Sequence, residues 1–189
     1  YSKSILGENN HVYFYTDVSN NSILELQRKI TAQVKNLNDK KNEAANLGLD
    51  VKLTPLHLHI NSPGGGLFAC FSFLDYCNQL KNIHSDLQIY SIVEGRAASC
   101  GSLMSVVCDK RFIGQNSYIL IHQLSSMSYG KYEELKDDMK NCDSLMDKIK
   151  NIYKKHTKIP AKKLDEILKH DLYFDADECL KYKLVDEII

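Results

Sequence analysis

The stretch VEGRAASCGSLMSV, residues 93–106, joins the end of an apolar strand pattern to the start of a helix pattern through small residues. Glu94 and Gly95 form the turn, and Ser99 follows two alanines and precedes Cys100. Backbone N–H groups at such a helix start can hold an anion or a developing oxyanion. Ser99 is therefore either a nucleophile or a small residue that lets a helix start close to a strand.

Strand and helix patterns alternate on both sides of this stretch. Aromatic and β-branched residues, or apolar residues in alternation, predict strands at 11–17, 55–61 and 87–93. Apolar residues at helical spacing predict helices at 21–37, 67–80 and 99–108. The polar segment 38–52 is expected to be a helix end and an exposed loop. This alternation predicts an α/β fold with mainly parallel strands, and 189 residues suit a single domain over 1–189.

The second half of the chain contains two short strand patterns within 111–123, joined by a turn at 114–116, and then a long helix that begins near Lys131. On this helix an apolar seam recurs every three or four residues, at Leu135, Met139, Cys142, Met146, Ile149 and Tyr153. The seam predicts a packing partner, such as another subunit. Pro160 suits the first turn of the next helix, and Asp175 with Glu178 is typical of a capping box.

Composition excludes several classes of function. The formal net charge is zero, which disfavours nucleic acid and anionic membranes as partners, and no apolar run approaches the roughly 20 residues of a membrane span. Six cysteines without a C-x-x-C pair disfavour a zinc site and favour reduced thiols in a reducing compartment. The seven histidines lack ligand spacing. We therefore expect a cytoplasmic protein, or one of organellar or viral origin, without a metal.

Three further signals complement Ser99. NSPGGG, residues 61–66, is a second strand–glycine–helix junction, His122 ends the apolar strand YILIHQ, and Asp171 precedes the apolar LYF. Alone, each has a simpler explanation: a tight turn, a structural histidine and a helix cap. Together they supply a nucleophile, a general base, an orienting acid and an oxyanion loop, which is the set that acyl transfer needs.

Four ordered motifs resemble the ClpP caseinolytic serine peptidases, over the chain from about His11 to its end. INSPGG (60–65) resembles the glycine loop of that family, and GRAASCGS (95–102) resembles its nucleophile segment. ILIHQ (119–123) resembles its catalytic histidine strand, and HDLYFDADECLKYKLVDEII (170–189) resembles its closing segment. The resemblance implies a serine endopeptidase that cleaves unfolded polypeptides to short peptides through an acyl-enzyme.

By this resemblance Ser99 is the nucleophile, His122 the general base and Asp171 the acid. The backbone N–H groups of Gly64 and Cys100 would form the oxyanion hole, so the Cys100 thiol is expected to be incidental. The substrate-binding residues implied are Gly65, Leu124, Ser125 and Ser126.

The resemblance also implies a spiral of ββα units with a protruding handle, here about residues 124–157. Family members form seven-membered rings that stack in pairs, and a AAA+ unfoldase threads substrate into them. That partner uses the ATP, so no cofactor is expected for this chain. Alternatives in the same fold are a non-catalytic ring subunit and a viral or phage maturation protease. A crotonase-type enolate site and the Ser–Lys signal-peptide peptidases match the motifs poorly.

Four segments depart from the family pattern. HQLSSMSYGKYEEL (122–135) lacks the proline and glycine-rich strand that usually follow the histidine, and His170 replaces a common arginine that pairs across rings. Ring stacking is therefore predicted to be weaker or pH-dependent. The link NLNDKKNEAANLGLDVKLTP (36–55) is longer than usual, and segment 1–10, at the place of the family's axial pore, lacks the usual arginine.

Overall fold

The computed structural model describes residues 5–189. Within these residues eight strands form one sheet in the order β1-β2-β3-β4-β5-β8, with β6 paired to β4 and β7 paired to β6. The strands are β1 (Ile5–Glu8), β2 (His11–Phe14), β3 (Leu56–Ser62), β4 (Ile89–Ala98), β5 (Lys110–Ile113), β6 (Tyr118–Leu120), β7 (Tyr173–Phe174) and β8 (Glu187–Ile188).

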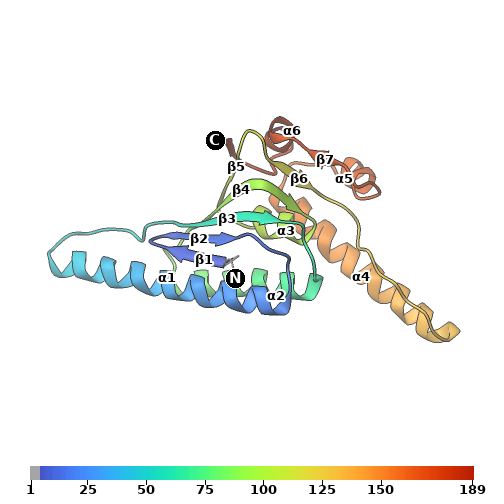
Figure 1. Cartoon of the computed structure of the whole chain (residues 1–189), viewed down its shortest axis with the longest axis horizontal. Coiled ribbons are helices and arrows are strands. Elements are labelled where there is room, and N and C mark those ends of the chain that lie inside the picture. The colour runs from blue at the N-terminus through green and yellow to red at the C-terminus, as the bar shows by residue number, and fades with distance from the viewer. Residues whose placement is uncertain (1–4) are drawn as a thin grey trace.

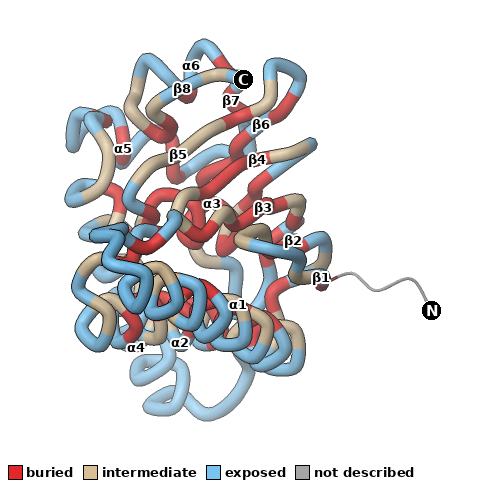
Figure 2. The backbone as a smooth tube through the Cα atoms, turned by 90° about the vertical axis from the view of Figure 1, so that its left-hand side faces the viewer, coloured by how far each residue is buried: buried red, intermediate tan, exposed pale blue. Residues whose placement is uncertain are grey.

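The same residues form six helices. They are α1 (Asn20–Asn46), α2 (Leu67–Ile83), α3 (Cys100–Val106), α4 (Tyr132–His156), α5 (Ala161–Ile167) and α6 (Ala176–Lys181). Helices α1 and α2 lie side by side along one face of the sheet (Figure 1). Figure 2 shows the buried residues concentrated in the central strands and α3, where the sheet meets these helices. The predicted α/β fold, with β2, β3, β4 and β5 paired in parallel, is confirmed.

Strand β3 explains which face of the sheet is covered. Leu56, Leu58 and Ile60 are fully buried, whereas His57 and His59 point to the other face, as the alternation predicts. Packing of this apolar row against the helices supplies the hydrophobic stabilisation of the layer. The C-terminal end of β3 therefore reaches the glycine loop in a fixed position.

Strand β4 changes its pairing partner at Gly95. Its first half pairs with β5, from Tyr90 to Val93, and its second half pairs with β6, from Arg96 to Ala98. Gly95 has a φ of +76°, and its N–H donates to the Ser117 hydroxyl at 2.8 Å. Glycine adopts this conformation without the cost that a side chain would add. The bend carries the end of β4, and with it Ser99, toward β6.

Helix α1 is longer than expected. The helix continues through the segment predicted to become a loop and ends at Asn46, close to Gly48. Lysine, glutamate and alanine favour helix, and this segment contains no proline or glycine before Gly48. Lys41 also forms an ion pair with Asp86 at 2.6 Å, which ties the extension to the loop after α2.

The handle is built by α4, which begins at Tyr132 and protrudes from the body (Figure 1). Residues 124–130 before it have no regular secondary structure. Only the base of the predicted seam is buried in this chain: Ile149 and Tyr153 are 5% and 1% exposed, but Met139 is 64% exposed. Of the N-terminal segment 1–10, residues 1–4 lie outside the described residues, and Ile5–Glu8 pair antiparallel with β2.

Candidate active site

Ser99 occupies the N-cap of α3 in a conformation unusual for a side chain-bearing residue. Its φ is 55° and its ψ is −121°, and its hydroxyl makes no capping hydrogen bond. A serine N-cap ordinarily uses its hydroxyl to cap the helix. The turn is held instead by the backbone, because Ser99 N–H donates to Leu120 O at 2.9 Å and Ser102 N–H donates to Ser99 O at 3.0 Å. The strained turn leaves the hydroxyl available for chemistry.

The glycine loop packs directly under this turn. A Cβ on Gly64 would lie 2.7 Å from Ala98 O and 2.7 Å from Ser99 Cβ, and Gly64 has a φ of +93°. Only glycine meets both demands. The N–H of Gly64, the predicted oxyanion donor, points to Ser62 Oγ at 3.2 Å. Its neighbour Gly65 lines the cavity beside Ser99.

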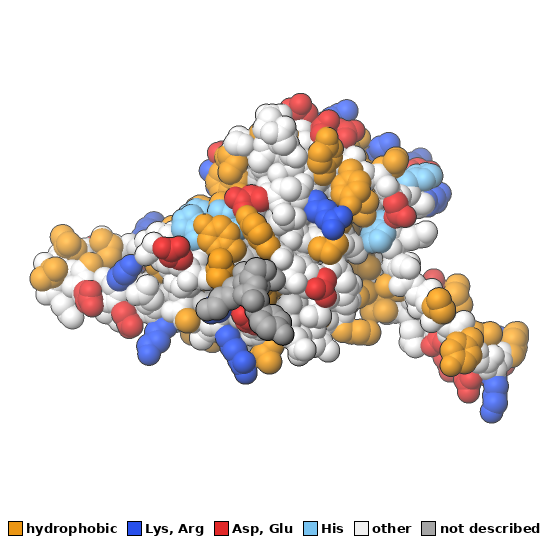
Figure 3. All heavy atoms as spheres, viewed as in Figure 1, with side chains coloured by type: hydrophobic (Ala, Val, Ile, Leu, Met, Phe, Trp, Pro, Cys, Tyr) orange, Lys and Arg blue, Asp and Glu red, His pale blue; other side chains and the backbone are white. Residues whose placement is uncertain are grey.

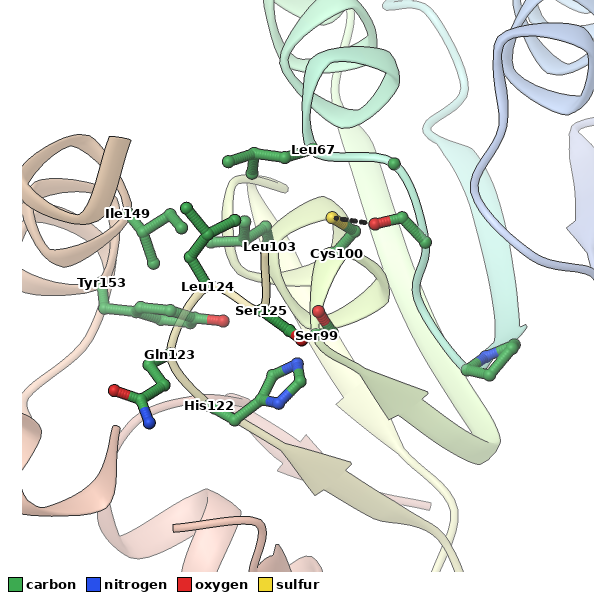
Figure 4. Close-up of a pocket in the computed structure, with 13 residues that line it drawn as sticks. Leu67, Ser99, Cys100, Leu103, His122, Gln123, Leu124, Ser125, Ile149 and Tyr153 are labelled. Atoms are coloured by element: carbon green, nitrogen blue, oxygen red, sulfur yellow. Dashed lines mark hydrogen bonds between the residues drawn. The ribbon is translucent and has the colours of Figure 1, made fainter. Parts of the chain in front are cut away.

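Cys100 connects the two glycine junctions. Its thiol donates to Gly65 O at 3.3 Å, which is the contact drawn in Figure 4. Cys100 is also the first residue of α3, so its backbone N–H is one of the four that a helix leaves without an intrahelical partner. The cavity therefore has both predicted oxyanion-hole segments on one wall.

His122 reaches Ser99 through strand pairing. Ala98 pairs with Leu120 in parallel register, which places the residues after β4 and β6 side by side. The His122 ring accordingly lies beside Ser99 in the cavity (Figure 4). This parallel pairing is the reason that residues 23 positions apart in the sequence meet.

Asp171 meets His122 from the next strand pair. Strands β6 and β7 are antiparallel, and Leu120 pairs with Tyr173, so the same register brings position 171 opposite position 122. The Asp171 Oδ1 and His122 Nδ1 atoms are 2.9 Å apart. If Nδ1 carries the proton that it donates to the carboxylate, Nε2 is the ring nitrogen that can accept one. The Asp171 side chain is 79% exposed, compared with 26% for His122.

The cavity that Ser99 and His122 line has a volume of about 380 Å³. Its wall is mainly apolar and is formed by Leu67, Leu103, Leu124, Ile149 and Tyr153 (Figure 4). Three of the predicted substrate-binding residues line it, namely Gly65, Leu124 and Ser125. The fourth, Ser126, lies in an adjoining groove that Leu124 and Ser125 also line.

The sequence did not identify Tyr153 as part of the site. Tyr153 is fully buried, and its hydroxyl is 2.6 Å from Ser102 Oγ, which donates to Ser99 O at 2.6 Å. Burial raises the pKa of Tyr153 well above its usual range. Ser102 thus links Tyr153 on helix α4 to the backbone of the Ser99 turn. The heptad-like spacing of α4 is the available signal, and from the sequence it predicts only a packing partner such as another subunit.

Among residues 5–189, no three His, Cys, Asp or Glu side chains are grouped so that they could hold a metal ion. None of the helices described there has the length and apolar character that crossing a membrane requires.

The chain is similar to known proteins of one family. The family model for Clp protease matches residues 7–189. The chain is 33% identical over 136 residues to an ATP-dependent Clp protease proteolytic subunit of Deinococcus radiodurans, which covers 71% of this chain and 64% of that protein. It is 28% identical over 167 residues to ATP-dependent Clp protease proteolytic subunit 2 of Bacillus licheniformis, covering 87% and 80%. The first of these matches spans just under two thirds of the relative's length.

Proposed function

The chain belongs to the Clp protease family, and from that premise we propose that it is a serine endopeptidase, the proteolytic subunit of a Clp-type protease that cleaves unfolded polypeptides. One observation carries the proposal. The Ser99 hydroxyl caps no helix and shares a cavity with His122, whose other face is hydrogen-bonded to Asp171. A small residue needed only for packing would not require this arrangement.

The mechanism follows from the positions of these groups. His122 Nε2 removes the proton from the Ser99 hydroxyl as Ser99 Oγ attacks the carbonyl carbon of the scissile peptide. Asp171 stabilises the imidazolium that forms. The imidazolium then donates its proton to the leaving amine, and an acyl-enzyme remains on Ser99. Water activated by His122 hydrolyses this ester and restores the free serine.

The oxyanion of each tetrahedral intermediate needs two donors. We assign the backbone N–H groups of Cys100 and Gly65 to this role, because Gly64 donates to Ser62 Oγ and Gly65 lines the cavity. This assignment moves the glycine donor one residue from the position that the sequence indicated. Each donor is worth on the order of 3 kcal/mol of transition-state stabilisation.

The apolar wall indicates which side chain the cavity accepts. Leu103, Ile149 and Tyr153 are buried residues that face it beside Ser99. An apolar side chain next to the scissile bond would bury its surface there, at about 25 cal/mol per Å². The irregular segment 124–130 offers backbone to an extended substrate on the same side.

The family in general forms rings and works with an ATPase partner, and we extend both properties to this chain. We propose seven-membered rings stacked in pairs, with a AAA+ unfoldase that hydrolyses the ATP. The outer part of α4 supports this, because Figure 3 shows hydrophobic side chains gathered at its far end. The exposed large hydrophobic residues in this part of the helix and in the segment before it are Met127, Tyr129, Tyr132, Leu135 and Met139. Such a surface is typical of an interface between subunits.

The proposal is tested by degradation of an unfolded, fluorescently labelled protein by the assembled chain, with and without a AAA+ partner. Ser99→Ala should abolish cleavage, a loss of about 10⁶-fold for a serine nucleophile. Ser85→Ala, at an exposed serine in the loop after α2, is the matched control and should retain full activity. Equal activity of Ser99→Ala and the wild type would contradict the proposal, and an inactive wild type in confirmed rings would support the non-catalytic subunit.

A further inference from the structure

Two cysteines meet directly behind the nucleophile. Cys70 lies on α2 and Cys100 begins α3, and the Cys70 thiol donates to Cys100 O at 3.5 Å. Each thiol is also the largest influence on the pKa of the other. The two cysteines thus lie next to each other on two different helices, with the Cys70 sulfur against the backbone of Cys100.

The two thiols differ in how they can react. Cys100 lines the active-site cavity, whereas Cys70 is fully buried behind it. The neighbouring Cys70 thiol lowers the pKa of the Cys100 thiol, against the effect of its burial, and Ser99 and the Gly65 backbone lower it further. The Cys100 thiol in turn raises the pKa of Cys70. Cys100 is therefore the thiol with more thiolate character and with access from the cavity, which are the two requirements for oxidation.

The remaining cysteines provide a contrast. Burial raises the pKa of Cys108 to about 12 and that of Cys179 to about 12, and it raises the pKa of Cys77 further. These three are buried and do not line the active-site cavity. Cys142 lies on α4 and is partly exposed. They are thus available as internal controls for oxidation at the pair.

We propose that Cys100 and Cys70 are a peroxide-sensitive pair, in which a hydroperoxide oxidises Cys100 from the cavity and Cys70 then closes a disulfide behind the nucleophile. In the first step the Cys100 thiolate attacks one oxygen of hydrogen peroxide, the O–O bond breaks, and the other oxygen leaves as water after it takes a proton. In the second step Cys70 sulfur loses its proton and attacks the Cys100 sulfenic sulfur. The S–O bond breaks and a second water leaves. Two thiols lose two electrons and two protons, and the peroxide is reduced to two waters.

The disulfide would change the geometry of the cavity wall. The Cys100 thiol would no longer donate to Gly65 O, because its sulfur would be bonded to Cys70 on α2. The backbone of Cys100 and Gly65 carries both proposed oxyanion donors, so peptide cleavage should fall on oxidation and return on reduction. This consequence rests on the proposed function, whereas formation of the disulfide does not.

The test is peptide mapping of the assembled wild-type protein after hydrogen peroxide, with intact mass measured in parallel. We expect a mass loss of about 2 Da and a cross-linked peptide pair that joins Cys70 to Cys100, both reversed by dithiothreitol. The rate at which a fluorophosphonate labels Ser99 should fall at least about tenfold and recover on reduction, since removal of one oxyanion donor costs on the order of 100-fold or more.

Two variants make the result specific. Cys70→Ala should keep basal labelling of Ser99 but show a dimedone-reactive sulfenic acid at Cys100 in place of the disulfide. Cys179→Ala, at a buried thiol elsewhere, should behave as the wild type. If Cys70→Ala does not fold, the wild-type peptide map decides alone. Peroxide that oxidises Cys142 while Cys70 and Cys100 stay reduced would overturn the proposal. A Cys70–Cys100 disulfide in a protein that no fluorophosphonate labels would instead overturn the proposed function.

Discussion

Ser99 and Asp171 belong to one set of contacts, but the protein holds them in different ways. The Ser99 turn is fixed by a backbone bond to Leu120, by the close approach of Gly64 and by Ser102 beneath it. Asp171 has 79% of its side chain exposed, and its hydrogen bond to His122 faces solvent. Water screens such a pair and weakens the orientation that it imposes. A single chain therefore holds Ser99 in a fixed turn, whereas it leaves Asp171 open to solvent.

Gly64→Ala should cause the largest loss of activity among these variants, because it disturbs the turn that holds Ser99. The added Cβ would meet Ala98 O and Ser99 Cβ at 2.7 Å, and the φ of +93° would be strained by about 1–3 kcal/mol. We expect turnover to fall by about 100-fold or more, because a small displacement of reacting groups is enough for such a loss. The measurement is kcat/KM on an apolar peptide together with the free energy of unfolding.

Gly48→Ala is the matched control. Gly48 also has a positive φ, of +78°, but a Cβ there has nothing within 4 Å. It should lose a similar backbone contribution to stability and keep full turnover. Equal activity losses in the two variants would show that strain alone, rather than contact with Ser99, explains the effect.

Asp171→Asn should have a smaller effect than in a protease whose acid is buried. Loss of a buried acid lowers kcat by about 10⁴-fold, and we expect a loss of about 10- to 100-fold in the unassembled chain because Asp171 is exposed. Its melting temperature should stay close to that of the wild type. The test compares kcat in the isolated and the ring forms, with Asp137→Asn on the exposed face of α4 as the control. A full 10⁴-fold loss in isolated chains would show that the acid is already organised.

Tyr153→Phe should have a smaller effect, and it tests whether the hydrogen bonds from Tyr153 through Ser102 stabilise the Ser99 turn. The change removes the hydroxyl that bonds Ser102 Oγ at 2.6 Å and leaves the buried ring in place. We expect a cost of about 1 kcal/mol in the free energy of unfolding and a several-fold loss in kcat. Tyr118→Phe, at a tyrosine that is 46% exposed, should change neither quantity. If Tyr153→Phe changed neither the free energy of unfolding nor kcat, α4 would contribute only apolar residues to the cavity wall and would not stabilise the Ser99 turn.

The free energy of unfolding should depend on pH through histidines that lie away from the site, on the face of β2 and β3 opposite the buried apolar row. There His11 and His57 stack with ring centroids 4.7 Å apart, and burial, followed by the neighbouring histidines, lowers the pKa of both. The folded state therefore binds these protons less readily than the unfolded chain, whose histidines titrate near 6.5. Stability should be complete above that pH and be lost as the pH falls through the lower pKa values of the folded state.

Urea unfolding between pH 7.5 and 5 measures this slope. His57→Gln should flatten it, and His170→Gln, at an exposed histidine near the site, should not. A slope unchanged by His57→Gln would place the proton-linked loss elsewhere. Since neither variant alters Ser99, His122 or Asp171, the peptidase profile of His57→Gln should match that of the wild type.

Much of the fold and the site could be predicted because local patterns coincide with tertiary contacts. The alternation of Leu56, Leu58 and Ile60 determined which face of β3 is buried, and the Asp175–Glu178 capping box forms as predicted. The order of the motifs was informative about His122 because parallel pairing of β4 with β6 brings the ends of consecutive strands together. Strand alternation, helix capping and parallel strand pairing follow from backbone geometry, and they therefore produce residue patterns that can be recognised in the sequence.

Other features depend on directions that a sequence does not encode. Of the two adjacent glycines at 64 and 65, Gly64 donates its N–H to Ser62 Oγ and Gly65 lines the cavity, which is the difference that our assignment of the oxyanion donor uses. The contact of Cys70 with Cys100 joins residues on helices whose packing no spacing rule specifies. The end of α1 was missed because charged residues suit a loop and an exposed helix equally well, and the ion pair of Lys41 with Asp86 favours the helix.

Covalent labelling of Ser99 would show whether this serine is an activated nucleophile, as we propose. The assembled protein is incubated with a fluorophosphonate, and intact mass and peptide mapping locate the adduct. We expect one adduct per chain on Ser99, absent in Ser99→Ala and formed more slowly in Asp171→Asn. An assembled wild-type protein that remains unlabelled, or one labelled equally after Ser99→Ala, would contradict it.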